Sequence, residues 1–218
     1  MYDVFHSVYL ETQKLILLET SGMSNLSDKP ITGEYLESRV FSDEDPDIYE
    51  YLKHRNAIDQ YDQRTTDIAV VDTGRETGIK TYILMPPVVY GLGSGPFNKS
   101  SIPIPTIIQA ALKSRQVEVI GDGSAVMDYV HIADLASLYV LVLTRVLEGT
   151  DMPSGERGIY FCATGSYTWK QLSTRIGKAG YELGVLDTPE VKSISLDEAA
   201  ERWTKGSRQV AQLGFSAK

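Results

Sequence analysis

Residues 80–91, Lys-Thr-Tyr-Ile-Leu-Met-Pro-Pro-Val-Val-Tyr-Gly, begin with a short apolar run that two prolines end abruptly. A second apolar run, Leu15-Ile-Leu-Leu18, ends in the polar residues Glu19-Thr-Ser-Gly22. Continuous apolar runs of this length are typical of strands buried in a parallel sheet. The intervening sequence predicts a helix in two pieces between residues 47 and 77, with Gly78 as its C-cap. The two runs therefore predict parallel strands joined by a helical crossover.

The rest of the chain alternates between helical and strand-like patterns. These patterns predict helices over residues 3–13, 104–113 and 134–147 and from Thr168, strands over 117–120 and 158–162, and an irregular loop over 27–47. Residues 134–147 are apolar around most of the helix circumference, which predicts a buried helix. The last predicted helix opens with Ser195-Leu-Asp-Glu198, the pattern of a capping box. Strands that alternate with helices predict an α/β fold with a largely parallel sheet.

The composition limits the class of protein. The chain has 218 residues, of which 42% are hydrophobic and 23% charged, as in ordinary globular domains. Its net charge of -8 argues against a nucleic-acid partner, because phosphates would repel it. The chain has neither an apolar stretch near the ~18 residues of a membrane span nor the pattern of a signal peptide. We therefore expect a cytoplasmic protein without a nucleic-acid or membrane partner.

Cysteine and histidine usage gives no sign of a metal site. The single cysteine, Cys162, excludes an internal disulfide and a cysteine-rich metal site, and its apolar surroundings predict a buried thiol. The three histidines, His6, His54 and His131, are scattered without the spacing of metal ligands. We expect no bound metal.

The ends of the two apolar runs are where chemistry is expected. Ligands of open parallel sheets bind outside the carboxyl ends of the strands. The runs end at Thr20-Ser21-Gly22 and at Pro86-Pro-Val-Val-Tyr-Gly91, so both loops are expected on one rim of one crevice. A hydroxyl of the first loop can hydrogen-bond a substrate carbonyl or hydroxyl. Backbone groups of the second loop can hold a flat amide ring.

Four motifs occur in a fixed order along the chain: Leu17-Leu-Glu-Thr-Ser-Gly22, Tyr82-Ile-Leu-Met-Pro-Pro-Val-Val-Tyr-Gly91, Val119-Ile-Gly-Asp-Gly123 and Asp128-Tyr-Val-His-Ile-Ala-Asp134. From about Ile16 to Phe215 the chain resembles the extended short-chain dehydrogenases. It is most similar to their NAD-dependent epimerase/dehydratase branch, in atypical forms common in fungi. The resemblance implies a Rossmann-like sheet, here the C-terminal strands only, with a small α/β substrate subdomain. The cofactor part would cover residues 1–100, and the substrate subdomain would cover 101–218.

The same resemblance implies a cofactor, NAD or NADP, a small-molecule substrate and a set of site residues. Ser21 would be the hydroxyl that orients the substrate. Thr20 and the loop that follows the second strand would contact the nicotinamide, through Pro86, Pro87, Val88 and Val89. Residues toward the substrate would be Tyr90, Asp122, Asp128 and His131. We expect Asp134 to cap the helix that follows rather than to contact a ligand.

In this chain, the tyrosine and lysine that the family uses depart from their usual pattern. The family places them four residues apart on a helix, where the ammonium favours the phenolate and binds ribose. Tyr49 and Lys53 match literally but lie farther from the next strand than the resemblance suggests. Tyr61 lies closer to the expected place, with Arg64 and Thr65 where the lysine should follow, and arginine is a poor substitute. Three alternatives stay open: Tyr61 with Arg64, Tyr49 with Lys53, or no catalytic tyrosine.

The glycine-rich fingerprint that binds a dinucleotide is a second departure. It is not found before Ser21, and Gly91-Leu-Gly-Ser-Gly95 follows a different strand and is expected to be a surface loop. We therefore expect a chain without the N-terminal part of the Rossmann domain, which binds dinucleotide poorly. The strand at 15–18 would keep an unpaired edge, which favours a homodimer.

Two hypotheses about function follow. The first is an NAD(P)-dependent oxidoreductase, epimerase or dehydratase that acts on a small hydroxy or carbonyl substrate, impaired or incomplete as this chain. The second is a non-catalytic regulatory or interaction protein that retains the short-chain-dehydrogenase fold.

Overall fold

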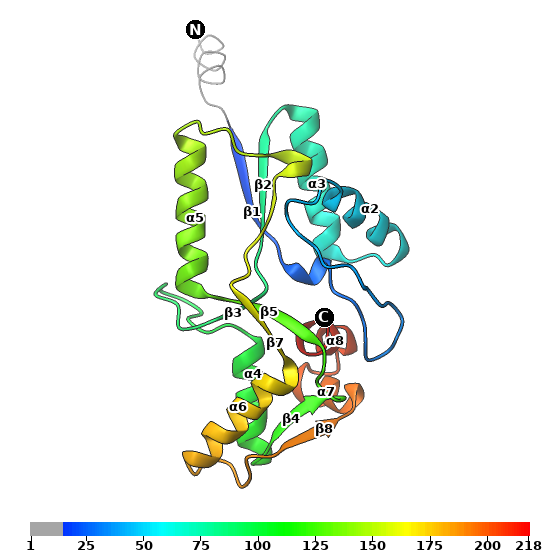
Figure 1. Cartoon of the computed structure of the whole chain (residues 1–218), viewed down its shortest axis with the longest axis vertical. Coiled ribbons are helices and arrows are strands. Elements are labelled where there is room, and N and C mark those ends of the chain that lie inside the picture. The colour runs from blue at the N-terminus through cyan, green and yellow to red at the C-terminus, as the bar shows by residue number, and fades with distance from the viewer. Residues whose placement is uncertain (1–14) are drawn as a thin grey trace. The chain divides into compact units, whose positions relative to one another are not determined.

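The computed structural model describes residues 15–218, so the helix predicted over 3–13 lies outside the described residues (Figure 1). The chain divides into two compact units. The first contains the described residues up to Asn25, then Phe41–Met85 and Leu143–Phe161; the second contains Leu26–Val40, Pro86–Val142 and Cys162–Lys218. The chain passes between the units several times. The assignment of a cofactor role to residues 1–100 and a substrate role to 101–218 stays a prediction.

The first unit is built on the two apolar runs. Strand β1 (Ile16–Thr20) pairs in parallel with β2 (Lys80–Met85), which pairs in parallel with β6 (Ile159–Phe161). Helices α2 (Ile48–Ile58) and α3 (Asp62–Thr77) connect β1 to β2, which confirms the predicted crossover in two pieces. Thr20 is paired with Leu84, so both strands end at the same edge of the sheet.

Burial differs between the strands of this sheet. Residues 81–85 of β2 are all buried, as the continuous apolar run predicts. Strand β1 is the edge of the described sheet, in the order β1-β2-β6, and its flank is exposed at Leu15 (58%) and Leu17 (41%). An open edge of this kind favours association with another chain. The homodimer stays a prediction.

The second unit holds a mixed sheet and a two-stranded sheet. Strand β5 (Val126–His131) pairs in parallel with β3 (Val88–Tyr90) and antiparallel with β7 (Gly165–Thr168). Strand β4 (Val117–Ile120) pairs in parallel with β8 (Val191–Ile194). The helices of this unit are α4 (Pro103–Ser114), most of α5 (Ile132–Leu147), α6 (Trp169–Glu182), α7 (Leu196–Trp203) and α8 (Arg208–Phe215). The core of the second unit forms around Trp169, Ile120, Leu186 and Phe215.

Helix caps in the second unit form as the sequence predicts. The Ser195 hydroxyl accepts a hydrogen bond from the Glu198 N–H (3.2 Å), and the Glu198 carboxylate accepts one from the Ser195 N–H (2.8 Å). Thr168 and Gln171 form a second capping box at the start of α6. Such caps satisfy N–H groups that have no partner within the helix.

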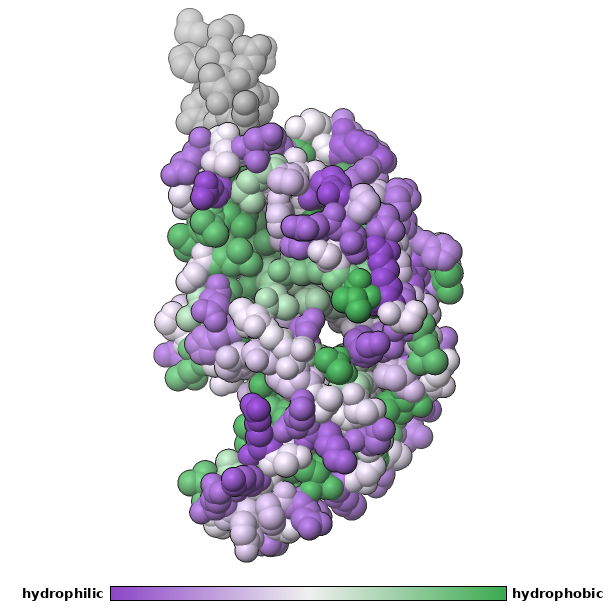
Figure 2. Space-filling view, in the orientation of Figure 1, coloured by the Kyte–Doolittle hydropathy of each residue, from purple (hydrophilic) through white to green (hydrophobic). Residues whose placement is uncertain are grey.

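Helix α5 corrects two predictions. It begins at Ile132, so Asp134 lies in the first turn rather than at the N-cap, and the Ala133 N–H donates to Nδ1 of His131 (3.2 Å). Its predicted burial is also wrong, because Val140 and Leu147 are 65% and 75% exposed. Figure 2 shows hydrophobic residues at the surface over this helix. An apolar circumference allows burial on every side, but burial also requires neighbouring elements on every side.

Helix α3 packs closely against β2 because Gly74 has no side chain. A Cβ at Gly74 would lie 2.5 Å from Cγ2 of the buried Thr81 and 2.8 Å from the carbonyl oxygen of Ile79. Gly74→Ala is expected to lower the free energy of unfolding by about 1–3 kcal/mol through this overpacking. Chemical denaturation measures the change. The exposed Thr73→Ala is the control and should change stability by less than about 0.5 kcal/mol; equal effects would contradict the close packing.

Candidate functional site

The loop after β1 brings a serine to a tyrosine from a distant part of the chain. A short 3-10 helix, Met23–Asn25, carries Ser24, and Tyr61 stands at the N-cap of α3. The two hydroxyl oxygens are 3.3 Å apart, and the Ser24 hydroxyl donates to Oε1 of Gln63 (2.8 Å). Since a hydroxyl has one hydrogen to donate, Tyr61 is then the donor to Ser24. Tyr61, Ser24 and Gln63 therefore form a hydrogen-bonded chain, half-buried at the carboxyl end of β1.

Ser21, the predicted substrate hydroxyl, lies outside the hydrogen-bonded chain of Tyr61, Ser24 and Gln63. It is buried, and its hydroxyl donates to Oδ2 of Asp67 (2.8 Å). The side-chain amide of Asn25 donates to the same carboxylate oxygen and to the Ser21 hydroxyl (3.1 Å). The hydroxyl beside Tyr61 is thus that of Ser24, which the sequence analysis did not single out. The second serine in Thr20-Ser-Gly-Met-Ser24 was the signal available.

Asp67 carries the buried carboxyl that accepts these hydrogen bonds from Ser21 and Asn25. It is 0% exposed, and burial raises its pKa to about 7, against the lowering effect of the hydrogen bond from Ser21. The neighbouring charge of Glu19 raises it further, and the hydrogen bond from Asn25 lowers it. Oδ1 of Asp67 has no hydrogen-bond partner among the described residues. A buried carboxylate with one unpartnered oxygen is costly when charged, which is consistent with the raised pKa.

The raised pKa of Asp67 predicts a pH dependence of stability. The folded state holds this proton up to about pH 7, whereas an unfolded aspartate loses it near its ordinary value of 3.8. The contribution of this group to the free energy of unfolding is therefore largest below pH 3.8. It falls as the pH rises to 7, by at most about 1.4 kcal/mol per pH unit for one proton. Asp67→Asn removes the titration. The unfolding free energy of the wild type minus that of Asp67→Asn should fall between pH 4 and pH 7; a constant difference would contradict the prediction.

Arg64 is hydrogen-bonded to the backbone on both sides of the site, and its predicted catalytic role stays a prediction. Its guanidinium is buried, and it donates to the carbonyl oxygens of Asn25 (2.9 Å) and Asp59. It lies over the ring of Tyr61, 5.5 Å from the centroid, and burial lowers its pKa. Thr65 occupies the position four residues after Tyr61, where its hydroxyl accepts from the Asn56 amide (3.0 Å). The described site thus has no ammonium at the position of the family's lysine.

The alternative pair, Tyr49 and Lys53, has a different setting. Tyr49 is buried, and its hydroxyl donates to Oδ1 of Asp72 (2.6 Å). Burial, with that hydrogen bond, raises the pKa of Tyr49. Lys53 lies 5.1 Å from the centre of the Tyr49 ring and forms an ion pair with Glu50. A tyrosine that exchanges protons with a substrate needs an accessible hydroxyl, so the half-buried Tyr61 fits this role better than the buried Tyr49.

Thr20, a predicted cofactor contact, ends β1 in the first unit, and the remaining predicted residues fall in the second unit. Val88 and Val89 lie in β3 directly after Pro86 and Pro87, and Tyr90 ends that strand. The Tyr90 ring meets His131 edge-on at 5.0 Å between centroids. Asp128 is half-buried in β5, and burial raises its pKa. The structure therefore brings Tyr90 and His131 together.

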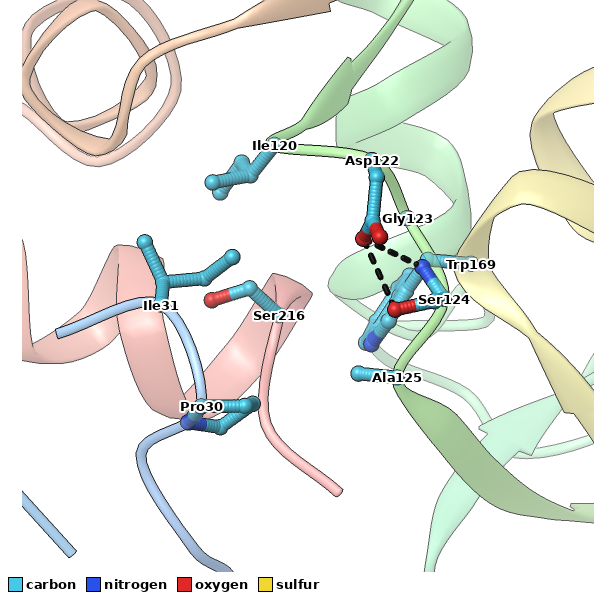
Figure 3. Close-up of a pocket in the computed structure, with 9 residues that line it drawn as sticks. All are labelled: Pro30, Ile31, Ile120, Asp122, Gly123, Ser124, Ala125, Trp169 and Ser216. Atoms are coloured by element: carbon cyan, nitrogen blue, oxygen red, sulfur yellow. Dashed lines mark hydrogen bonds between the residues drawn. The ribbon is translucent and has the colours of Figure 1, made fainter. Parts of the chain in front are cut away.

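Asp122 lies elsewhere in the second unit, at a cavity (Figure 3). The residues that line this cavity do not include Tyr90, Asp128 or His131. Strand β4 delivers Asp122 through the turn Gly121-Asp-Gly123, in which both glycines have positive φ (60° and 67°). A side chain at Gly121 would also meet Ile31, which lines the cavity, at 2.8 Å.

The glycine cluster of residues 91–95 lacks the features of a dinucleotide site. In the glycine cluster of residues 91–95, the Gly93 N–H is bonded to the Lys99 carbonyl oxygen (2.8 Å). Helix α4 follows this cluster, and Pro103 and Pro105 remove two N–H donors from its first turn. A pyrophosphate site at a helix N-terminus relies on such donors. The glycine cluster and the start of α4 therefore do not provide the N–H donors of a pyrophosphate site.

Two features are absent from residues 15–218. They contain no group of three histidine, cysteine, aspartate or glutamate side chains that could hold a metal ion. None of their helices is long and apolar enough to cross a membrane. Cys162 is buried, as predicted.

Comparisons with known proteins bear on this fold and site. The chain is 24% identical over 175 residues to "Oxidase ucsJ" from Acremonium sp, a match that covers 74% of this chain and 48% of that protein. DesIV, a dTDP-glucose 4,6-dehydratase from Streptomyces venezuelae with NAD and TYD bound, superposes with a TM-score of 0.53 at 19% identity. That match covers 82% of this chain and 47% of DesIV.

MlghC, a GDP-mannoheptose C4 reductase from Campylobacter jejuni with NADP bound, gives a TM-score of 0.53 at 15% identity and covers 89% of this chain and 60% of its own. These likenesses confirm the predicted α/β, Rossmann-like fold. The chain spans about half the length of the relatives it matches. The model of the NAD dependent epimerase/dehydratase family matches residues 38–153, just over half of the chain. The chain therefore belongs to the NAD dependent epimerase/dehydratase family.

Proposed function

We propose that this chain carries the substrate-side part of an NAD(P)-dependent oxidoreductase, epimerase or dehydratase that acts on a small hydroxy or carbonyl substrate. The observation that supports this is the hydrogen-bonded chain of Tyr61, Ser24 and Gln63 at the carboxyl end of β1. Ligands bind at this end of the strands in open α/β sheets. Solved structures of similar fold have NAD or NADP bound, and one curated relative is named an oxidase.

The proton step follows from the two hydroxyls. Tyr61 gives a proton to the substrate oxygen when a carbonyl is reduced, or takes it when an alcohol is oxidised. The Ser24 hydroxyl, held by Gln63 at rest, turns to hydrogen-bond the same oxygen and fixes its position. NAD or NADP, when bound, supplies or accepts the hydride. The cofactor and substrate contacts implied for Thr20, Ser21, Pro86–Tyr90, Asp122, Asp128 and His131 remain predictions.

Calorimetric titration of NAD and NADP tests this proposal. Because the glycine cluster and the start of α4 do not provide the N–H donors of a pyrophosphate site, we expect weak binding or none to this chain. Under the proposal, any longer native version of the protein is expected to bind one of the two cofactors. Binding of neither cofactor by either protein would contradict the proposal.

The threonine in the place of the family's lysine gives a prediction of its own. Thr65 is exposed and lies four residues after Tyr61, so Thr65→Lys would place an ammonium on the same face of α3. We expect turnover at neutral pH to rise by about tenfold, since an ammonium favours the phenolate that takes the proton. The rate constant kcat is the readout. Thr66→Lys, one residue farther around the helix, is the control; equal effects of both variants would contradict the expected role.

A second candidate function is supported by the same departures. Arg64 is committed to two backbone carbonyls, and Thr65 provides no charge beside Tyr61. A non-catalytic regulatory or interaction protein that keeps the fold would tolerate both. On that hypothesis, Tyr61→Phe and Ser24→Ala leave biological activity intact.

A further inference from the structure

The second unit contains a cavity of about 170 Å³ at the turn after β4 (Figure 3). Side chains of Ile31, Ile120 and Ser216 point toward the same space, with the Trp169 ring on the opposite side. The lining consists of Pro30, Ile31, Ile120, Asp122, Gly123, Ser124, Ala125, Trp169 and Ser216. Pockets for drug-sized ligands measure roughly 300–1,000 Å³. This cavity is large enough only for a small group, such as one ring or a short chain.

The side-chain hydrogen-bond donors that line the cavity are already used within the protein. The Ser124 N–H and hydroxyl both donate to Oδ1 of Asp122 (2.9 and 2.8 Å). The Ser216 hydroxyl donates to the Gln212 carbonyl oxygen (3.0 Å), and the Trp169 indole N–H to that of Ala217 (3.3 Å). The lining therefore offers a ligand mainly acceptors: the Asp122 carboxylate and the oxygen lone pairs of the two serines.

The charge of the lining also disfavours an anionic ligand. Hydrogen bonds from the backbone and side chain of Ser124 hold the pKa of the Asp122 carboxyl below its usual range, so it is ionised at neutral pH. Lys170 lies near enough to lower that pKa further, but it does not line the cavity. Lysine and arginine are absent from the nine lining residues. A phosphate or carboxylate here would face a fixed negative charge and find no free side-chain donor.

We infer that this cavity binds the hydroxyl or amine end of a small apolar group and excludes phosphate and carboxylate. DesIV and MlghC are named for nucleotide-linked sugars, whose diphosphate this cavity could not hold. The idea that this group is part of the substrate rests on the proposed function. The binding preference itself is a property of the second unit and stands apart from Tyr61 chemistry.

Four probes that share one ring test the inference: benzyl alcohol, benzylamine, benzoate and benzyl phosphate. Each is titrated into the full chain without cofactor, while NMR follows the indole N–H signal of Trp169, with Trp203 as an internal reference. We expect saturable shifts of Trp169 with the alcohol and the amine, and binding at least about tenfold weaker for the two anions. Anions that bind as tightly as the alcohol, or no saturable shift with any probe, would overturn the inference.

Variants separate the role of Asp122 from general effects. Asp122→Asn keeps an oxygen acceptor for Ser124 but removes the charge, so benzylamine should bind about fivefold more weakly while benzyl alcohol changes little. Asp187→Asn, an exposed carboxylate that pairs with Arg115 in the same unit, is the matched control and should change neither. An equal loss in both variants would contradict the site. Tyr61→Phe should bind the probes normally, so failure of the proposed enzyme chemistry would leave this result unchanged.

Discussion

Replacing Tyr61 with phenylalanine is expected to lower turnover by about 100-fold or more while the protein stays folded. The change removes the hydroxyl that lies 3.3 Å from Ser24, and with it the group that exchanges a proton with the substrate oxygen. Loss of a positioned general acid or base typically has an effect of this size. The ring remains, so its contact with Arg64 is kept. The measurement is kcat and kcat/KM under conditions in which the cofactor is bound.

Two comparisons make this result specific. Ser24→Ala should cost less, about tenfold, because it removes a hydrogen bond to the reacting oxygen but not the proton donor. Tyr181→Phe, an exposed tyrosine of the second unit, is the matched control and should leave turnover unchanged. Wild-type turnover in Tyr61→Phe would favour the non-catalytic alternative.

Asp67→Ala is expected to lower the free energy of unfolding by about 2–4 kcal/mol. The substitution removes the acceptor of the Ser21 hydroxyl and of the Asn25 amide, and both of these donors are buried. It also leaves a small cavity at a fully buried position. Chemical denaturation at neutral pH gives the change in stability.

The conservative variant distinguishes a lost hydrogen bond from lost charge. Asp67→Asn keeps an oxygen for Ser21 and should retain most of the stability, because at about pH 7 the wild-type carboxyl is half protonated. Glu76→Ala, an exposed position on the same helix, is the control and should change stability by less than about 0.5 kcal/mol. A loss of stability in Glu76→Ala as large as in Asp67→Ala would contradict the stabilising role of the Asp67 carboxyl.

The parts of the fold that follow from the sequence are those with a strong local pattern. Strands β1 and β2 are continuous apolar runs, and α3 ends at Gly78 in a left-handed conformation that glycine favours. Strands β3, β5, β7 and β8 were not predicted, because three to six residues with interspersed polar side chains have no clear local signal. Their pairing joins segments far apart in the chain, as between β5 and β7.

The site, too, can be predicted from the sequence only in part. The sequence predicts Ser21 directly after the first strand, where the structure has it. It does not predict that Tyr61 stands at the N-cap of α3. It does not show that the 3-10 turn rotates Ser21 inward to Asp67 and turns Ser24 toward Tyr61. That choice depends on a buried carboxyl 46 residues away from Ser21.

The most direct test of an NAD(P)-dependent enzyme is the oxidation of NADH and NADPH by the native protein. The reaction is supplied with small aldehydes and ketones, and the alcohol product is quantified alongside the oxidised cofactor. The structure predicts one alcohol formed for each cofactor oxidised, with loss of both in a Tyr61→Phe, Ser24→Ala double variant. Product formation by the double variant at the wild-type rate would contradict the central role of these two hydroxyls.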